Sequence, residues 1–458
     1  MMQKKHNLIE STIILGIIIT CIAVSVIGLH LSPVIAVLFA VVITMIYAFV
    51  KRYPLSMLNE GIMAGVKPGI IPIFIFILVG ALIAVWIKAG IIPSLMVFGF
   101  DILSVKFFVP SVFIVCAVVG SAIGSAFTVM STIGIAFFGI GTSLGLSQPL
   151  IVGAIVSGAV FGDKMSPLSE STNLASAVVG ADLFEHIKNL MWSTVPAFII
   201  SLILFTFFGL TNSNATIDQI EHVKSILMTN FNISWLAVIP ILFMFLCAWR
   251  KIPAIFTILL NILLTIVIMA IQNDHFNIIE IAKVLEHGYV AHTGNEEVNI
   301  LLSRGGIESM MPTVALIIVT LSLGGILMKL ELISPLMTVL AQKLERTGSL
   351  VLVTLFSAIG VNIFVGEQFL SVILPGNAFK PVYDLHRLKP VVLGRVLEDG
   401  GTVINYLIPW GVAGSFVAGT FHVATMDYLP FVFFSLLSPL FSALSGFTGI
   451  GIHYQEKK

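Results

Sequence analysis

Apolar runs of about twenty residues recur along the whole chain, each long enough to cross a bilayer as a helix. They lie at 11–29, 31–50, 68–87, 107–127, 184–209, 231–249, 253–271, 311–328, 349–366 and 429–451. Only 10% of the 458 residues are charged, whereas about a quarter are charged in soluble domains. A soluble fold cannot bury this much apolar surface, so most of it must face lipid. The sequence therefore predicts an all-α polytopic membrane protein.

Several classes of function are disfavoured by what the chain lacks. Its formal net charge is zero, which gives no reason to expect a nucleic-acid partner. It contains no His-Glu-x-x-His helix and no Gly-x-Ser-x-Gly elbow, so we do not expect an enzyme. The phosphate-binding lysine motif of ATP-driven proteins is also missing. We expect no cofactor, and the composition does not distinguish a monomer from an oligomer.

Basic residues gather between the apolar runs and predict the orientation of the spans. They are Lys4, Lys5, Lys51, Arg52, Lys67, Arg250, Lys251, Lys343, Arg346, Lys380, Arg387, Lys389, Lys457 and Lys458. One threading of the chain places all of them on the cytoplasmic side of the cell membrane. Both termini are then cytoplasmic, and the polar segments 210–230 and 272–309 are external.

The two halves of the chain resemble each other weakly. In the first half the order is Pro68, Gly80, Lys88, Pro93, Gly120 and Asp163, and in the second it is Pro312, Gly324, Lys329, Pro335, Gly360 and Asp399. The predicted orientation makes the halves inverted repeats, an architecture common among secondary transporters. We predict repeats at 1–210 and 231–458, joined by an external linker at 211–230, each repeat with broken or re-entrant helices. The alternative is that apolar helices simply look alike.

Two apolar stretches, 128–162 and 388–425, are interrupted by polar residues and are not expected to be straight spans. The first runs into the segment 162–173. Pro167 should end the helix that begins near Pro149, and Ser171, Thr172 or Asn173 would cap the next one. Freed carbonyls and carboxylates at such a break suit a cation. An ordinary polar surface loop is the alternative.

Asp163 is the residue on which this prediction depends most, because one carboxylate at the break would hold either Na⁺ or H⁺. Lys164 complicates the prediction. If it paired with Asp163, the pair would be structural, and Glu170 or Asp399 would carry the ion.

The second half offers a counterpart, in which Glu398 and Asp399 end an apolar segment and Gly400 to Thr402 break it. A gating or interface loop is the alternative. Each half also carries an earlier polar interruption. These are Ser121, Ser125, Thr128, Ser131 and Thr132 in the first half and Asn362, Glu367 and Gln368 in the second. Glu367 is the only acid between Glu345 and Asp384, so we predict that it exchanges a proton. It could instead be a structural glutamate.

Two other features receive weaker predictions. The polar residues between Tyr289 and Glu308 could form an external gate, although a solvated loop is slightly favoured. His186 follows Glu185 at the start of a long helix and is predicted to form a surface pair, not a proton relay.

Three motifs resemble the NhaC family of sodium/proton antiporters: GDKMSPLSESTNLA at 162–175, Thr-Gly at 293–294 with LLSRGGIESMM at 301–311, and LEDGGTVINYLIPW at 397–410. The resemblance extends from about residue 8 to residue 453 and implies exchange of Na⁺ for H⁺. The candidate ion-binding residues are Asp163, Ser166, Glu170, Ser171, Thr172, Asn173, Asn362, Glu367, Asp399, Thr402 and Asn405, with Na⁺ at Asp163, Thr172 and Asp399.

A malate/lactate-exchanging branch of the same family is similar to this chain around Asn405. Small carboxylates are therefore an alternative substrate class. A carboxylate would need a positive site, which the N-terminus of a helix starting near Leu174 would provide with support from Lys164 or Arg395.

Overall fold

The computed structural model describes residues 8–29, 31–102, 107–211, 217–250, 252–272, 276–333, 335–336 and 344–455. Six of the basic residues used above to orient the spans, Lys4, Lys5, Lys251, Lys343, Lys457 and Lys458, lie outside these ranges. Within them the chain is helical apart from turns, loops and one isolated bridge between Leu388 and Tyr454. Eight helices are long and apolar enough to cross a membrane, or up to eleven if each bent pair forms one span. The chain is a multi-pass membrane protein.

Most of each predicted apolar run is helical, but the run 107–127 is interrupted at Gly124 and Ser125, and the run 231–249 becomes helical only from Trp235. The first half contains α1 (Leu8–Ala23), α2 (Pro33–Val50), α3 (Leu55–Val66), α4 (Ile70–Lys88), α5 (Ile91–Ile102), α6 (Phe108–Ile123), α7 (Ala126–Val129), α8 (Ile135–Ser143), α9 (Gln148–Met165), α10 (Glu170–Val179) and α11 (Leu183–Thr211). The predicted linker contains α12 (Ile217–Asn230), which packs on α5 and α8.

The second half contains α13 (Val238–Trp249), α14 (Ala254–Gln272), α15 (Ile278–His287), α16 (Glu296–Leu302), α17 (Ile307–Lys329), α19 (Thr347–Val365), α20 (Gln368–Leu385), α21 (Pro390–Leu397), α22 (Val412–Phe421), α23 (Thr425–Tyr428) and α24 (Phe433–Thr448). A π-helical turn, η6 (Glu398–Thr402), continues α21. The α20 helix was not among the predicted spans.

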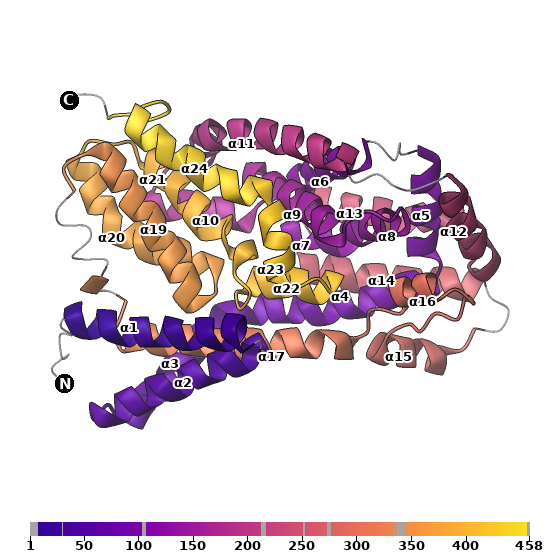
Figure 1. The fold of residues 1–458 in the computed structure, drawn as a ribbon, viewed down its shortest axis with the longest axis horizontal. Helices are drawn as coiled ribbons and strands as arrows, with labels where there is room; N and C mark the ends of the chain where they lie inside the picture. Colours follow the sequence, from indigo (N-terminus) through magenta and orange to yellow (C-terminus); the bar gives the residue numbers. More distant parts are fainter. Residues whose placement is uncertain are drawn as a thin grey trace.

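Close helix approaches hold the fold together. The α17 helix packs on α2, α3 and α4, and α11 lies beside α24 along one edge of the molecule (Figure 1). In the first half α6 packs most extensively on α9. There a Cβ on Gly162 would lie 2.5 Å from Cα of Gly120, so only small residues permit this contact.

The same local structure interrupts a span in each half. The α6 helix ends at Gly124, whose φ of +73° is left-handed, and the side chain of Ser125 caps α7. The α19 helix ends at Gly366, with φ of +72°, and the side chain of Glu367 caps α20. Left-handed glycine followed by a capping side chain is a common way to end one helix and begin another. The inverted orientation of the halves stays a prediction.

Candidate functional site

The predicted break between residues 162 and 173 is present. The α9 helix ends at Met165, and α10 lies at 46° to it. However, α10 begins at Glu170, not near Leu174, and its N-cap is Ser169, whose hydroxyl accepts a hydrogen bond from the Thr172 backbone N–H. The predicted caps at 171–173 are therefore wrong, because the turn after Pro167 is tighter than the sequence suggested.

Most polar side chains of this break are buried and hold its shape. The Thr172 hydroxyl donates to the Lys164 carbonyl at 3.2 Å. The Asn173 amide donates to the carbonyls of Pro167 and Ser169 at 2.9 and 2.7 Å. Ser166 is buried and accepts from the backbone N–H of Leu168. Glu170 and Asn173 are exposed, but the other buried and bonded side chains show that the break is not a wholly solvated loop.

A cavity of about 620 Å³ lies against both breaks of the first half. Its polar wall brings together Ser125, Thr128, Asp163, Glu170, Ser171, Asn173 and Gln368. The lining residues from α4, α13 and α14 are apolar except for Thr257 on α14. Four predicted site residues thus share one cavity: Asp163, Glu170, Ser171 and Asn173. Among its described lining residues none is Lys, Arg or His.

Two aromatic residues that line the cavity also contact a third ring. Phe76 stacks on Phe416 with ring centroids 4.8 Å apart, and Phe127 meets Phe416 edge-on with centroids 5.0 Å apart.

Lys164 points away from this cavity and joins the two halves of the chain. Its ammonium nitrogen lies 2.5 Å from Oδ1 of Asp399 and also donates to the hydroxyls of Ser193 and Ser438. The Ser438 hydroxyl donates to the same carboxylate oxygen. The alternative pairing of Lys164 with Asp163 is therefore wrong, and Asp399 lies in this buried ion pair and not on the cavity wall.

His186 and Glu398 form a second acid–base pair beside the first. The His186 Nε2 atom lies 3.9 Å from Oε1 of Glu398, and both side chains are fully buried. Neither ring nitrogen of His186 has a hydrogen-bond partner in the part of the chain that the structure describes. The Thr402 hydroxyl donates to the other carboxylate oxygen of Glu398. The predicted surface pair is wrong, because α21 and η6 cover this face of α11.

Two asparagines connect the polar segments of the second half. Asn362 donates to the carbonyls of Gly400 and Gly401, and Asn405 donates to the Asn362 side chain at 2.7 Å. The expected break at Gly400–Thr402 is instead a π-helical turn, and the chain becomes extended only near Ile408. The Gly400 and Gly401 carbonyls are thus occupied by Asn362.

Glu367 is buried at the N-terminus of α20, where its carboxylate accepts the Leu370 backbone N–H at 2.8 Å. The next two residues, Gln368 and Phe369, line the cavity. Glu367 therefore lies immediately behind the cavity wall. Asn362, Asp399, Thr402 and Asn405 lie in the networks described above and do not line the cavity.

The segment between α15 and α17 packs against the helices and is not a free loop. Arg304 donates to the Phe421 carbonyl at 3.2 Å and lies over the Phe138 ring. The Gly306 N–H donates to the Gly80 carbonyl at 2.7 Å. These contacts are not those of the solvated loop that was slightly favoured, and the external gate stays a prediction.

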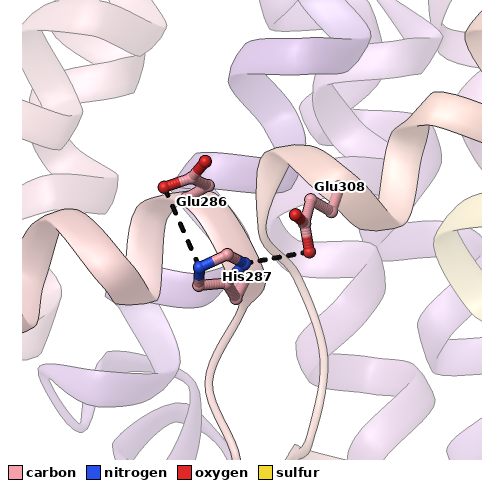
Figure 2. A group of neighbouring side chains, drawn as sticks. All are labelled: Glu286, His287 and Glu308. Atoms are coloured by element: carbon pink, nitrogen blue, oxygen red, sulfur yellow. Dashed lines mark ion pairs between the residues drawn. The ribbon is translucent and has the colours of Figure 1, made fainter.

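At the outer edge of this segment His287 bridges two acids (Figure 2). Its Nδ1 lies 3.0 Å from Glu308, and its Nε2 lies 3.9 Å from Glu286. All three side chains are exposed. The pairing fixes the end of α15 to the start of α17.

Ser193 and Ser438 were not selected from the sequence, because single polar residues in apolar runs are common, and His186 was selected with the wrong partner. Their partners become apparent only in the folded chain. Arg395, proposed above as support for an anion, donates instead to Ser445 and to the Gly451 carbonyl. Lys164 is paired with Asp399, and neither base lines the cavity.

Known proteins match this chain along nearly its whole length. The Na⁺/H⁺ antiporter family matches residues 6–171 and 158–450. The Na⁺/H⁺ antiporter NhaC of Alkalihalophilus pseudofirmus is 39% identical, covering 99% of this chain and 98% of that protein. NhaC of Bacillus subtilis is 36% identical, covering 94% and 95%. The malate-2H⁺/Na⁺-lactate antiporter of Bacillus subtilis is 33% identical, covering 98% and 96%. These matches confirm the resemblance to NhaC, and the chain belongs to the Na⁺/H⁺ antiporter family.

Proposed function

We propose that this protein is a secondary active transporter that exchanges Na⁺ for H⁺ by alternating access, in the cell membrane and with both termini cytoplasmic. The family and the names of the NhaC relatives support this function. The observation that carries it is the cavity wall on which Asp163 and Glu170 lie among hydroxyl and amide side chains. Oxygen ligands of this kind suit a hard cation such as Na⁺.

Competition for Asp163 is the simplest source of coupling. The ionised carboxylate binds Na⁺, and a proton that binds the same group releases the ion. If the site changes its accessible side only when one of the two ions is bound, then one ion must leave for each that enters. Glu367, one residue behind the cavity wall, is proposed as a second carboxylate that exchanges a proton.

The buried pairs Lys164–Asp399 and His186–Glu398 are proposed to hold η6 against α9 and α11. Thr172 and Asp399 were also predicted as Na⁺ ligands. Here Thr172 bonds the Lys164 carbonyl and Asp399 bonds the Lys164 ammonium. Direct contact of Na⁺ with Asp399 would require the ion pair to open.

Exchange of carboxylates fits the cavity less well. A second anion would face Asp163 and Glu170 without a basic partner among the described lining residues, and unpaired charge is costly where water is scarce. The cation is therefore the substrate that we assign to this site.

Proton movement in everted membrane vesicles tests the function. We expect Na⁺ addition to dissipate a preformed pH gradient with the native protein and with Asp384→Asn, a control at an exposed acid on α20. The Asp163→Asn variant should insert into the membrane at the native level. Its activity should fall at least about tenfold, which corresponds to a loss of about 1.4 kcal/mol or more of transition-state stabilisation. An Asp163→Asn variant with unaltered apparent Na⁺ affinity would show that Asp163 is not an ion ligand.

A further inference from the structure

The cavity is larger and more apolar than a site for one inorganic ion requires. Its volume of about 620 Å³ falls within the range of roughly 300–1,000 Å³ that is usual for sites of small organic molecules. Its apolar lining includes Ile71, Pro72, Ile75, Met244, Pro253 and Ile258. Sites for organic ligands typically combine such a wall with a few polar groups.

Three aromatic side chains, Phe76, Phe127 and Phe369, also line the cavity. An aromatic face attracts a cation, and recognition of substituted ammonium ions commonly uses this interaction. Together the rings, the apolar wall and two carboxylates form an environment for a positively charged group that carries alkyl substituents. An organic anion lacks a basic partner here, and a neutral molecule would leave the carboxylates without a counter-charge.

We propose that this cavity also binds small alkylammonium ions, with the charged nitrogen towards Asp163 and Glu170 and the alkyl groups against the aromatic and aliphatic walls. The inference rests on the proposed function, because it assigns a second class of substrate or competitor to the same cation site.

Phe369 is the ring best placed to meet such a ligand. Phe76 already stacks on Phe416, and Phe127 meets the Phe416 ring edge-on. Phe369 is only half-buried, and within the described ranges it stacks on no other ring. It follows Gln368 in the first turn of α20, directly after the buried Glu367. A ligand held by Asp163 across the cavity would therefore contact an unoccupied aromatic face.

Choline is a suitable probe, because its quaternary nitrogen has no proton to release and so does not itself collapse a pH gradient. Its neutral isostere 3,3-dimethyl-1-butanol has nearly the same shape. In everted vesicles we expect choline to raise the Na⁺ concentration needed for half-maximal proton movement, and we expect the isostere to have no effect. Radiolabelled choline should bind the purified full-length protein and be displaced by Na⁺.

Two matched variants locate the choline site. Phe369→Leu should weaken choline binding about threefold or more, as loss of a cation–π contact predicts, and this factor should exceed any change in the apparent Na⁺ affinity. Phe364 lies near the end of α19, four residues before the lining residue Gln368, and packs in a separate apolar cluster. Phe364→Leu should change neither choline binding nor the apparent Na⁺ affinity.

The outcomes separate this inference from the proposed function. Absence of Na⁺-dependent proton movement in the native protein would refute the proposed function, whereas choline binding to purified protein would still be measurable. Normal Na⁺ exchange without choline binding or competition would refute only the present inference. Choline binding that Phe369→Leu leaves unchanged would also overturn it, because the ligand would then lie elsewhere.

Discussion

The ammonium nitrogen of Lys164 lies 2.5 Å from Oδ1 of Asp399, and the two side chains are almost completely buried. This pair joins the end of α9 to η6, segments that lie in different halves of the chain. Removing both charges from water is expensive, so the pair must retain its geometry and its hydroxyl partners to be tolerated. It thereby fixes the position of the break that presents Asp163 to the cavity.

Removing one member of this pair should destabilise the protein strongly. Lys164→Met leaves the Asp399 carboxylate buried without its partner, which typically costs about 3–5 kcal/mol. The double variant Lys164→Met with Asp399→Leu removes both charges and should recover most of that loss. Thermal unfolding of the purified variants in detergent provides the measurement. Equal melting temperatures for the single and double variants would mean that the unpaired Asp399 carboxylate is not what destabilises Lys164→Met.

Two substitutions of Glu367 separate its role as a helix cap from its proposed role in proton exchange. The amide oxygen of Glu367→Gln can still accept the Leu370 N–H that the carboxylate accepts at 2.8 Å, so we expect near-native stability. Glu367→Ala removes the cap and should cost about 0.5–2 kcal/mol. If Glu367 exchanges a proton, both variants change the pH dependence of Na⁺-dependent proton movement. A native pH profile for Glu367→Gln would leave Glu367 as a structural cap.

The membrane spans could be predicted from the sequence, whereas the side-chain pairs between distant helices could not. The spans follow from the length of local apolar runs, and the break after α9 follows from Pro167, so both could be read locally. The pairs of Lys164 with Asp399 and of His186 with Glu398 depend on how distant helices pack. The N-cap at Ser169 was missed because several hydroxyl residues in a row could each have capped α10. The π-helical turn at 398–402 has no comparable local signal.

His287 should titrate above the ordinary range of histidine. Its hydrogen bond to Glu308 and the charge of that carboxylate raise the pKa of His287, and Glu286 adds to the rise. The charged pair that connects α15 to α17 is therefore fully present below the usual histidine pKa of about 6.5, and it is lost as the pH increases through the raised pKa of the folded protein.

Histidine NMR titration of the protein in nanodiscs checks this prediction. Glu308→Gln should return the pKa of His287 towards its ordinary value. Glu286→Gln is the matched control and should have a smaller effect, because its carboxylate lies 3.9 Å from the ring and that of Glu308 lies 3.0 Å away. An equal response to both substitutions would argue against the Glu308 hydrogen bond as the main cause.

Gly124 connects the two breaks of the first half, and its replacement should disturb the ion site. Its φ of +73° disfavours any residue with a Cβ, at a cost of roughly 1–2 kcal/mol. In addition, a Cβ would lie 2.8 Å from the Leu168 backbone and 2.9 Å from the Ser166 hydroxyl. Gly124→Ala must therefore move the 166–169 turn, which carries the N-cap of α10 and borders Asp163.

Gly145→Ala is the matched control for this effect. Gly145 has a similar φ of +67°, but no atom lies within 4 Å of the position that its Cβ would take. Both substitutions should reduce stability through backbone strain, whereas only Gly124→Ala should also raise the Na⁺ concentration needed for half-maximal proton movement in everted vesicles. Because both variants share the backbone strain, the difference between their apparent Na⁺ affinities reports the effect of the contact between residue 124 and the 166–169 turn. An unchanged apparent Na⁺ affinity in Gly124→Ala would mean that the position of this turn does not set ion binding.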